Sequence, residues 1–437
     1  MILDERGRWF AFFLLDSLRG GKVRKYYDEI RKGYREGTSV RETDGKIKEI
    51  ISHAVRTTGY YKGFAEDTPL ERLPVVNKDT YRGQYDAFLS SEYRNAKGSR
   101  VMSTSGSTGT PLQIIQDRDK IDHDTADGIF FGAMAGYYIG MKMGFLRVWV
   151  HGNKKSALRL FAENMIMVET SSLGDADIRK ILDMFKRKKV KCLIGYASSL
   201  AELSRYIDRN DVDTSRFSIR SIIPISESMP PAARKRLAEQ FSCPVQAWYS
   251  NEENGIMGIQ PREGTSYYID SENFHFEILK PDSDEPCKDG ELGRIVITDL
   301  RNRAMPIIRY DTGDLAKAKR EVHGDRYRLF LTEIYGRRGD MICDTKGNTL
   351  SPYILSINLW DAPGVMQYRF IQESADKYTL ELNGDPFKMD VDDILGRIRP
   401  YFGENATITP VFVDEIPVLA SGKRRYVENR WKKAPGL

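Results

Sequence analysis

The chain has 437 residues, of which 41% are hydrophobic and 30% are charged, and its formal net charge is +5. The apolar content is enough for sizeable cores, and the length predicts one large domain with a small one, or two to three domains. Because the net charge is mild and the basic clusters are short and free of interleaved aromatics, the composition argues against a nucleic-acid platform.

The cysteines and the apolar N-terminal stretch indicate in which cellular compartment the protein is expected. The four cysteines are far apart and form no Cys-x-x-Cys pair, which indicates neither a zinc site nor a disulfide framework and predicts a reducing, cytoplasmic location. Residues 9–15, from Trp9 to Leu15, are apolar but too few to span a bilayer, and we expect a helix packed on the domain. A shallow peripheral membrane anchor is the alternative, helped by the basic residues Arg19, Lys22, Arg24 and Lys25.

The first third of the chain is predicted to be mainly helical. Residues 1 to about 65 have apolar side chains at helical spacing, and Asn77 is a candidate N-cap for a helix over 77–89. A further helix is predicted over 120–139, and a strand over 145–151. That strand ends on His151, which either lies beside a ligand or, as a lone histidine, has a structural role.

A hydroxyl-rich stretch, Ser-Thr-Ser-Gly-Ser-Thr-Gly-Thr-Pro over 103–111, separates two short apolar runs and predicts a strand, a loop and a strand. Glycines let such a loop approach a ligand closely, and its hydroxyls and amides can surround a phosphate. It is not a Walker A loop, because no lysine follows Gly109 and a strand is expected next. A polar linker or hairpin turn is the alternative. The candidate phosphate-binding residues are Ser103, Thr104, Ser105, Gly106, Ser107, Thr108 and Gly109.

Residues 175–250 alternate between helical and strand patterns, which predicts a mainly parallel sheet with helices on its faces. In such a sheet ligands bind beyond the carboxyl ends of the strands, where residues 195–199, 226–228 and 250–255 would project. The predicted helices span 177–188, 198–208 and 230–240, and the predicted strands span 190–195, 219–225 and 245–249.

From 266 to 335 the pattern changes to strands and turns, which predicts a smaller β-rich subdomain. The run Gly-Arg-Arg-Gly-Asp over 336–340 interrupts it, and the tail to residue 437 is predicted to be a separate α+β domain. The predicted strands of the subdomain span 274–279, 293–298, 307–310 and 326–331.

Four segments carry side chains suited to nucleotide chemistry. In 248–253 an aromatic that can stack on a base precedes carboxylates that can hold Mg²⁺. In 310–314 a carboxylate just past a glycine turn can accept hydrogen bonds from both hydroxyls of a ribose. The arginines of 336–340 suit a phosphate contact and a hinge, and Lys423 lies on a flexible loop where it can neutralise charge on phosphate or carboxylate oxygens. Each segment alone also suits an ordinary turn, loop or solvated tail, but their order on this fold pattern indicates a site.

Together these segments resemble the adenylate-forming superfamily of acyl-CoA synthetases, peptide-synthetase adenylation domains and luciferases. The resemblance runs from about Leu73 to Arg425 and is strongest to the branch with phenylacetate–CoA ligase and its capsular-polysaccharide-biosynthesis relatives. The runs Gly-Glu-Leu-Gly-Arg-Ile-Val-Ile-Thr over 290–298 and Met-Pro-Ile-Ile-Arg-Tyr-Asp-Thr-Gly-Asp over 305–314 are similar to that branch. The other matching segments are the phosphate loop 103–111, the adenine-side loop 226–228, the Tyr-to-Glu motif 249–253, the hinge 336–340 and the lysine motif 417–423.

The resemblance implies an α/β fold. A large N-terminal domain over 1–336 would hold parallel-type sheets and the β-rich subdomain, and a small mobile C-terminal α+β domain over 337–437 would carry the catalytic lysine. It implies a ligase that activates a carboxylic acid with ATP and Mg²⁺ as an acyl-adenylate and passes the acyl group to coenzyme A. The alternatives are transfer to an amine in surface-polysaccharide or small-metabolite biosynthesis, AMP transfer to a non-carboxylate acceptor, and a non-catalytic nucleotide-binding protein.

The resemblance also implies roles at matching positions. Lys423 would assist attack of a carboxylate on the α-phosphate, and Glu253 would bind Mg²⁺. The implied nucleotide contacts are Ser226, Glu227, Ser228, Tyr249 beside adenine, Ser250, Asp314 on the ribose and Arg337 on ribose or phosphate. The implied hinge acid is Asp340, and the implied substrate pocket is lined by His151, Gly195, Tyr196 and Ser198.

The sequence departs from the family pattern at three of these motifs. Thr110 stands where many relatives have lysine, and Gly339 stands where an acidic hinge residue is common. Glu252 precedes Glu253 where serine or threonine is usual, which leaves the exact metal ligand open between them. The cysteines that bind zinc in some relatives have no clear counterpart.

Overall fold

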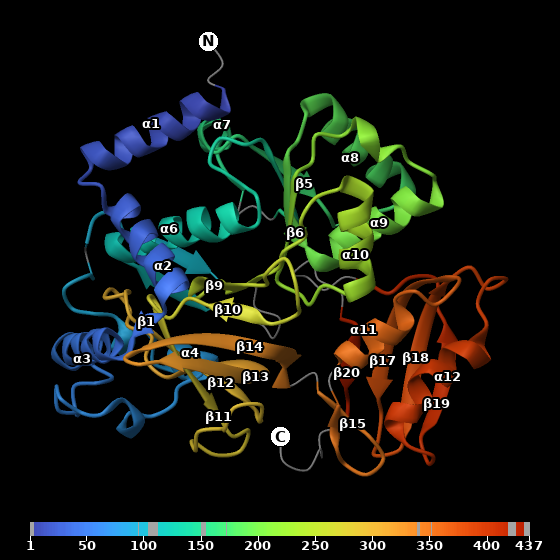
Figure 1. The fold of residues 1–437 in the computed structure, drawn as a ribbon. Coiled ribbons are helices and arrows are strands. Elements are labelled where there is room, and N and C mark those ends of the chain that lie inside the picture. The colour runs from blue at the N-terminus through green and yellow to red at the C-terminus, as the bar shows by residue number, and fades with distance from the viewer. Residues whose placement is uncertain are drawn as a thin grey trace. The chain divides into compact units, whose positions relative to one another are not determined.

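The computed structural model describes residues 4–94, 96–103, 112–149, 154–171, 173–338, 341–350, 352–417 and 425–431. It is a mixed α/β protein, as predicted, and the chain divides into two compact units (Figure 1). Unit 1 consists of Met1–Met143, Lys155–Met165 and Gln246–Glu333, and unit 2 consists of Gly144–Lys154, Ile166–Val245 and Ile334–Leu437.

An eight-stranded sheet forms the framework of unit 1. Its strands follow the order β11-β12-β13-β14-β10-β9-β8, with β1 paired to β14. The strands are β1 Thr38–Ser39, β8 Trp248–Asn251, β9 Gly255–Ile259, β10 Tyr267–Ile269, β11 Phe274–Leu279, β12 Leu292–Asp299, β13 Tyr310–His323 and β14 Arg326–Arg337. A separate antiparallel pair, β2 Arg100–Ser103 and β3 Gln113–Gln116, confirms the two strands predicted on either side of 104–111, which lie outside the described residues.

Five helices of unit 1 begin at a residue whose side chain accepts a hydrogen bond from a backbone amide of the first turn. Asn77 caps α4 in a capping box with Thr80, which confirms the predicted N-cap, although the predicted helix over 77–89 is broken at Gln84 into two short helices. The predicted helix over 120–139 begins at its cap Asp117 and ends at Met134, two residues before a left-handed glycine, Gly136. The helices are α1 Glu5–Leu18, α2 Lys22–Glu36, α3 Val40–Thr57, the 3₁₀ turn Leu70–Arg72, α4 Lys78–Gly83, α5 Tyr85–Phe88, α6 Arg118–Met134 and α7 Ala157–Ala162.

Unit 2 contains the predicted helix and strand alternation. Its four-stranded sheet has the order β5-β4-β6-β7, and β6 and β7 run parallel. The apolar faces of α8, α9 and α10 enclose a core with Phe185 and Leu200, which are fully buried. The elements are β4 Met143–Arg147, β5 Met165–Glu169, α8 Asp175–Lys188, β6 Cys192–Tyr196, α9 Ala197–Arg209, the 3₁₀ turn Thr214–Arg216, β7 Ser221–Ile225 and α10 Pro231–Phe241.

Residues 334–431 of unit 2 build a second sheet and core of their own. The sheet has the order β19-β18-β17-β20, and Phe370, Leu380, Ile394 and Phe402 are fully buried in its core. The elements are β15 Ile342–Cys343, β16 Thr349–Leu350, α11 Tyr353–Leu359, β17 Val365–Gln372, β18 Lys377–Gly384, α12 Val391–Phe402, β19 Thr407–Phe412 and β20 Val427–Asn429.

Three predicted strands are wrong in extent or partner. The strand over 145–151 is β4, which ends at Arg147. The segment 245–249 adds no full strand to the parallel sheet, because Val245 makes one isolated bridge to Ile222 and the chain then enters β8, which pairs antiparallel with β9. The strand over 307–310 begins only at Tyr310, because Arg309 has a left-handed backbone with φ of 48°.

Arg309 shows why that strand begins late. Its buried guanidinium forms two hydrogen bonds with the Glu277 carboxylate, at 3.0 and 3.1 Å, and donates to the carbonyl of Leu73 at 2.7 Å. An extended backbone at this residue would point the side chain elsewhere and leave these groups unpaired, at a cost typical of a lost buried ion pair.

Candidate active site

The β8–β9 hairpin of unit 1 carries three of the predicted site residues, Tyr249, Ser250 and Glu253. Tyr249 pairs with Gly258 and Asn251 with Gly255, so the tight connection 252–254 presents Glu253 at the end of the hairpin. The side chain of Asn251 accepts a hydrogen bond from the Asn254 amide at 2.7 Å, which closes the connection. The Glu253 side chain is buried although it lies in a turn, so its carboxylate needs partners.

Glu253 receives those partners from two other parts of unit 1. The hydroxyl of Tyr310 donates to its Oε1 at 3.0 Å, and the Lys78 ammonium lies 3.5 Å from the same oxygen. Tyr310 is the first residue of β13, and Lys78 is the first residue of the capped helix α4. The structure therefore joins a carboxylate, a phenol and an ammonium from three separate segments.

Lys78 was missed by the sequence analysis. One signal was available, because a lysine directly after the N-cap Asn77 puts a positive charge at the positive end of a helix, where it is unfavourable unless an anion lies nearby.

Two predicted site residues, Tyr249 and Asp314, are also in contact. The Tyr249 hydroxyl donates to Oδ2 of Asp314 at 3.0 Å. Burial, and then the charge of Asp314, raises the pKa of the Tyr249 phenol well above its ordinary value, so the phenol stays a donor at neutral pH. The residues predicted to flank adenine and to hold the ribose thus touch one another, and Ser250 follows Tyr249 as a half-buried side chain.

The prediction placed Asp314 just past a glycine turn. In the structure Asp314 does follow Gly313, but both residues lie in a bulge within β13. The pairing of β12 with β13 shifts between Arg294 and Val296, and Gly313 has a φ of 81°. A bulge puts an extra residue on one strand and re-aims its neighbours. Here Gly313 supplies the left-handed backbone, and the bulge aims Asp314 at Tyr249.

The oxygen atoms of Glu253 suit a magnesium ion, which prefers hard oxygen ligands and is usually bound through one or two carboxylates together with substrate phosphates. In the parts of the chain that the structure describes, no group of three or more His, Cys, Asp or Glu side chains could hold a metal by itself. Glu253 therefore fits a Mg²⁺ ion that nucleotide phosphates hold in large part.

The β2–β3 hairpin lies at the base of the predicted phosphate loop. Ser103 pairs with Gln113, and the strands continue in antiparallel register to Arg100 and Gln116. Leu112 and Ile114 are buried in the core, which anchors the loop on its C-terminal side. Of the candidate phosphate-binding residues, Ser103 ends β2 and is exposed, and 104–109 lie outside the described residues.

A buried ion network links the two hairpins within unit 1. The ammonium of Lys120, on α6, lies 2.9 Å from Asp299 and 3.0 Å from Asp124, and donates to the carbonyl of Asn254 at 2.8 Å. Asp124 also pairs with Arg100 of β2. Lys120 is fully buried, which disfavours the ammonium, but the charges of Asp124 and Asp299 prevail and raise its pKa. The network thus ties the base of the loop hairpin to the turn that carries Glu253.

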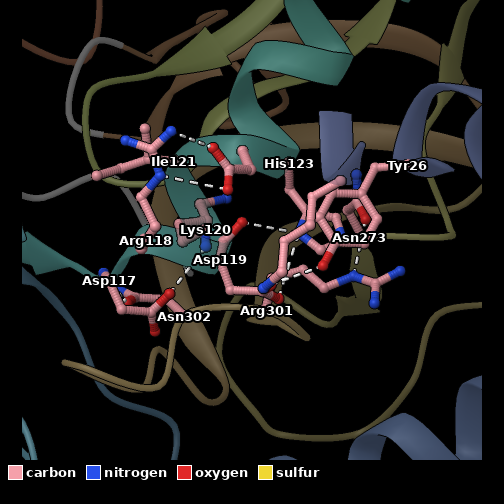
Figure 2. A network of polar contacts seen from close by, with 12 residues as sticks. Tyr26, Asp117, Arg118, Asp119, Lys120, Ile121, His123, Asn273, Arg301 and Asn302 are labelled. Carbon is pink, nitrogen blue, oxygen red and sulfur yellow. Dashed lines mark hydrogen bonds and ion pairs between the residues drawn. The ribbon is translucent and has the colours of Figure 1, made fainter. Parts of the chain in front are cut away.

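The start of α6, shown in Figure 2, is fixed by further polar contacts. Asp117 accepts from the Lys120 amide at 2.8 Å through one oxygen, and from the Arg303 and Ala304 amides at 2.6 and 3.1 Å through the other. In the first turn of α6, the Tyr26 hydroxyl donates to Asp119 at 2.6 Å. One turn further on, the Tyr26 ring stacks on His123 at a centroid distance of 3.4 Å. The helix that carries Lys120 therefore cannot shift without breaking contacts at its first turn.

We expect His123 to make stability pH-dependent. Burial, and then the charge of Arg301, lowers the pKa of its imidazole to about 2 from 6.5. Below pH 6.5 the unfolded chain binds a proton at His123 that the folded chain does not, so the free energy of unfolding should fall with decreasing pH by up to about 1.4 kcal/mol per pH unit. Urea unfolding at pH 8 to 5 should show a shallower loss for His123→Asn than for the wild type. Equal slopes in the two proteins would contradict the buried neutral state.

In unit 2, two predicted segments lie together at the carboxyl ends of β6 and β7. The last pair of these parallel strands is Tyr196 with Ile225, and the amide of Ser198 donates to Oε2 of Glu227 at 2.9 Å. Ser226 has a left-handed backbone with φ of 69°, and both Ser226 and Ser228 are exposed. Of the three segments predicted at this edge, 195–199 and 226–228 meet there, whereas 250–255 belongs to the β8–β9 hairpin of the other sheet, because β8 pairs antiparallel with β9.

Gly195 has a packing role in this arrangement. A Cβ atom at this position would lie 2.7 Å from the Leu146 Cβ and 2.9 Å from the Leu146 carbonyl oxygen, so only glycine lets β6 approach β4. Tyr196 is buried at the start of α9. Their role in a substrate pocket stays a prediction.

The roles of the remaining predicted residues stay predictions. Arg337 is the exposed last residue of β14. His151, Asp340 and Lys423 lie outside the described residues, so their roles rest on the sequence alone.

Comparison with known proteins relates the chain to two groups of sequences. No family model matches it. It is 23% identical to Protein CapK of Staphylococcus aureus over 439 residues, which cover 94% of this chain and 93% of the relative. It is 26% identical to phenylacetate-coenzyme A ligase of Thermus thermophilus over 320 residues, 68% of this chain and 70% of the relative, and 24% identical to the Escherichia coli ligase of the same name over 341 residues, with the same coverage of each chain.

Solved structures share its fold. 2-Hydroxyisobutyryl-CoA ligase in the postadenylation state, in complex with R3-HIB-AMP, superposes with a TM-score of 0.71 at 17% identity, over 89% of each chain. ATP-bound MatB from Rhodopseudomonas palustris superposes with a TM-score of 0.54 at 16% identity, over 74% of this chain and 66% of MatB. At these identities the superpositions establish the fold alone, which is that of adenylate-forming ligases.

Proposed function

We propose that this chain, which has the fold of adenylate-forming ligases and sequence relatives among phenylacetate–CoA ligases and CapK, activates a carboxylic acid with ATP. A carboxylate oxygen of the acid would attack the α-phosphorus, the bond to the β-phosphate would break, and pyrophosphate would leave with the bonding electrons. Two sets of contacts carry the proposal. Tyr249 bonds to Asp314, and Glu253 is held by Tyr310 and Lys78. The relatives named above, which include CoA ligases and an ATP-bound structure, support it.

The side chains take distinct roles in this proposal. The Tyr249 ring lies against adenine, Asp314 accepts from the ribose hydroxyls, and Ser103 with 104–109 surrounds the phosphates. Glu253 would hold Mg²⁺, which neutralises phosphate charge when bound. Lys78 is an additional cation beside Glu253, and Lys423 stabilises charge at the reacting oxygens. Ser226, Glu227 and Ser228 would border the adenine, and Arg337 the ribose or phosphate.

The acyl group then passes to an acceptor, and we propose coenzyme A. The thiolate would attack the acyl carbon and AMP would leave. Support comes from the phenylacetate-coenzyme A ligases and from a 2-hydroxyisobutyryl-CoA ligase structure with CoA bound, which matches with a TM-score of 0.54. An amine acceptor is the second candidate, and it is favoured by the likeness to CapK along nearly the whole chain. In either case residues 337–437 would move about Asp340 between the two steps.

A reducing, cytoplasmic location is part of the proposal. Burial raises the pKa of the Cys192 and Cys243 thiols to about 12, so both stay protonated and unreactive, as suits structural cysteines in such a compartment. No helix in the described ranges has the length and apolarity that a bilayer crossing requires. Peripheral contact through residues 9–15 is compatible with both facts.

Exchange of labelled pyrophosphate into ATP tests the proposal directly. We expect exchange that depends on Mg²⁺ and on one class among aryl, fatty, hydroxy and amino acids. Product analysis with coenzyme A and with candidate amines would then identify the acceptor. Measurable ATP binding without exchange for any acid in the panel would favour a non-catalytic nucleotide-binding protein, and AMP attached to a non-acid acceptor would favour AMP transfer.

The ribose contact can be tested separately. Asp314→Asn should raise the KM for ATP by about 10- to 100-fold, because a charge-assisted hydrogen bond contributes roughly 1.5–3 kcal/mol and the amide also disturbs the bond from Tyr249. The matched control is Asp282→Asn, which alters an exposed aspartate of the same unit. A KM for ATP that is equal in the variant, the control and the wild type would exclude Asp314 from the ribose site.

A further inference from the structure

Helix α1 is inverted relative to an ordinary surface helix. Its charged residues Arg8 and Asp16 are each only 8% exposed, whereas Phe10, Leu14 and Leu18 are 63%, 48% and 76% exposed. Residues 8 and 16 lie on one stripe of the helix, and residues 10, 14 and 18 lie on another, offset by about 200° because each residue turns by roughly 100°. A helix that only covers a domain buries its apolar stripe instead.

Polar contacts fix this orientation. The Arg8 guanidinium donates to the carbonyls of Phe161 and Ala162 on α7, and the Asp16 carboxylate accepts from the Val23 and Arg24 amides at 3.1 and 3.0 Å. Rotation of α1 to bury its leucines would break both sets of bonds and leave buried charges without partners. The exposure of the apolar stripe is therefore a built feature of unit 1.

The exposed apolar surface extends beyond the stripe. Trp9 and Leu15 flank it, and α7 adds Leu158 and Phe161, which are also exposed. The Arg8 guanidinium lies 4.6 Å from the centre of the Phe161 ring, so α7 lies beside α1, as Figure 1 shows. Large exposed apolar side chains gathered on neighbouring helices are typical of an interaction site. The apolar face is defined as Trp9, Phe10, Leu14, Leu15, Leu18, Leu158 and Phe161.

The charges next to the apolar face identify its partner. Residues 19–25 contain Arg19, Lys22, Arg24 and Lys25 and no acidic residue. Three of these cations have ion pairs, to Asp119, Asp28 and Glu29, but the cations are exposed, and exposed ion pairs contribute little and exchange readily. Apart from the buried Asp16, the acids of α1 are Asp4 and Glu5 at its start, and Glu163 at the end of α7 is paired with Lys155 and Arg159. An apolar stripe with a tryptophan at its edge and a cluster of cations beyond one end is typical of a helix that lies in the interface of an anionic bilayer.

We propose that the apolar face inserts into the headgroup region of an anionic lipid bilayer, with the cations of 19–25 on the lipid phosphates. The binding depends on α1 and α7 alone. Only its consequence, that acid activation takes place at a membrane surface, rests on the proposed function.

Co-sedimentation with vesicles tests this proposal. The full chain should partition onto phosphatidylcholine vesicles that contain about one-third phosphatidylglycerol, and weakly onto phosphatidylcholine alone. The variant Phe10→Ser with Leu14→Ser should lose at least about tenfold in partition coefficient. Both side chains are exposed, so the melting temperature should not fall. The matched control is Phe387→Ser, which removes an apolar side chain that is 98% exposed in unit 2 and should bind vesicles like the wild type.

Two results would overturn the proposal. One is equal partition of the double variant and the wild type, or no partition of either onto both vesicle types. The other is a wild type that does not bind vesicles but self-associates or captures a protein, with that association lost in the double variant. The apolar face would then be a protein interface. Pyrophosphate exchange measured without vesicles should be the same in all three proteins, so failure of membrane binding is distinguished from failure of the proposed chemistry.

Discussion

The variant Lys423→Ala is expected to form acyl-adenylate about 10²- to 10³-fold more slowly than the wild type, with ATP affinity nearly unchanged. A preorganised cation acts where charge develops during the reaction, and removal of one such group typically costs this much. ATP affinity should persist because the proposed adenine and ribose contacts come from Tyr249 and Asp314 of unit 1, which the substitution does not touch. Pyrophosphate exchange and equilibrium ATP binding, measured side by side, separate the two quantities.

A lysine outside the motif serves as the control for Lys423. Lys433→Ala removes the same charge from the same C-terminal segment and should keep wild-type exchange. Lys423→Arg should recover little activity, because a guanidinium keeps the charge but differs in shape and in hydrogen-bond geometry. Wild-type turnover in Lys423→Ala would remove the assignment of this lysine and leave Lys78 as the candidate cation.

The candidate residues that the sequence could nominate are those whose chemistry is local. Tyr249 and Glu253 belong to one hairpin, and Asp314 follows a glycine in a short polar run, so residue type and spacing were sufficient to find them. The same holds for Asn77, whose capping depends on the next three residues.

What the sequence could not predict depends on partners distant in the chain. Lys78 meets Glu253, which lies 175 positions further along the chain, and neither residue type implies the other. The start of β13 depends on how Arg309 satisfies Glu277 and the Leu73 carbonyl, which no local propensity records. The prediction placed 245–249 in the wrong sheet, because a short buried strand has the same apolar pattern whichever strand it pairs with. In the structure Val245 makes one bridge to Ile222, and the residues from Trp248 on pair with β9.

These distant contacts also explain how the site is held in shape. Each of the two candidate carboxylates, Glu253 and Asp314, accepts a hydrogen bond from a buried tyrosine, and each pair joins the β8–β9 hairpin to β13. Beneath them, Lys120 bonds to the turn next to Glu253. Because a site loses activity when its side chains are displaced by about 1 Å, such supporting contacts matter to catalysis as well as to stability.

Replacement of Lys120 is accordingly expected to be the most destabilising single change in unit 1. Lys120→Met keeps the length of the side chain but leaves Asp299 and Asp124 without their shared cation in a fully buried setting. Breaking a buried ion pair by removal of one partner costs about 3–5 kcal/mol, and the Asn254 carbonyl also loses its donor. Urea unfolding at neutral pH measures the loss, with the exposed pair of Lys22 and Asp119 as the control, since Lys22→Met should cost no more than about 1 kcal/mol.

A second substitution tests whether the cost arises from the uncompensated charge. Asp299→Asn in the Lys120→Met background removes one of the two buried negative charges and should recover part of the lost stability, because Asp124 keeps its pair with Arg100. If the double variant folds, its pyrophosphate exchange should remain below that of the wild type, because the Asn254 carbonyl stays without its donor and the turn that carries Glu253 is less restrained. A Lys120→Met protein as stable as the Lys22→Met control would show that the buried network contributes no net stability, and wild-type exchange in the double variant would show that it does not position Glu253.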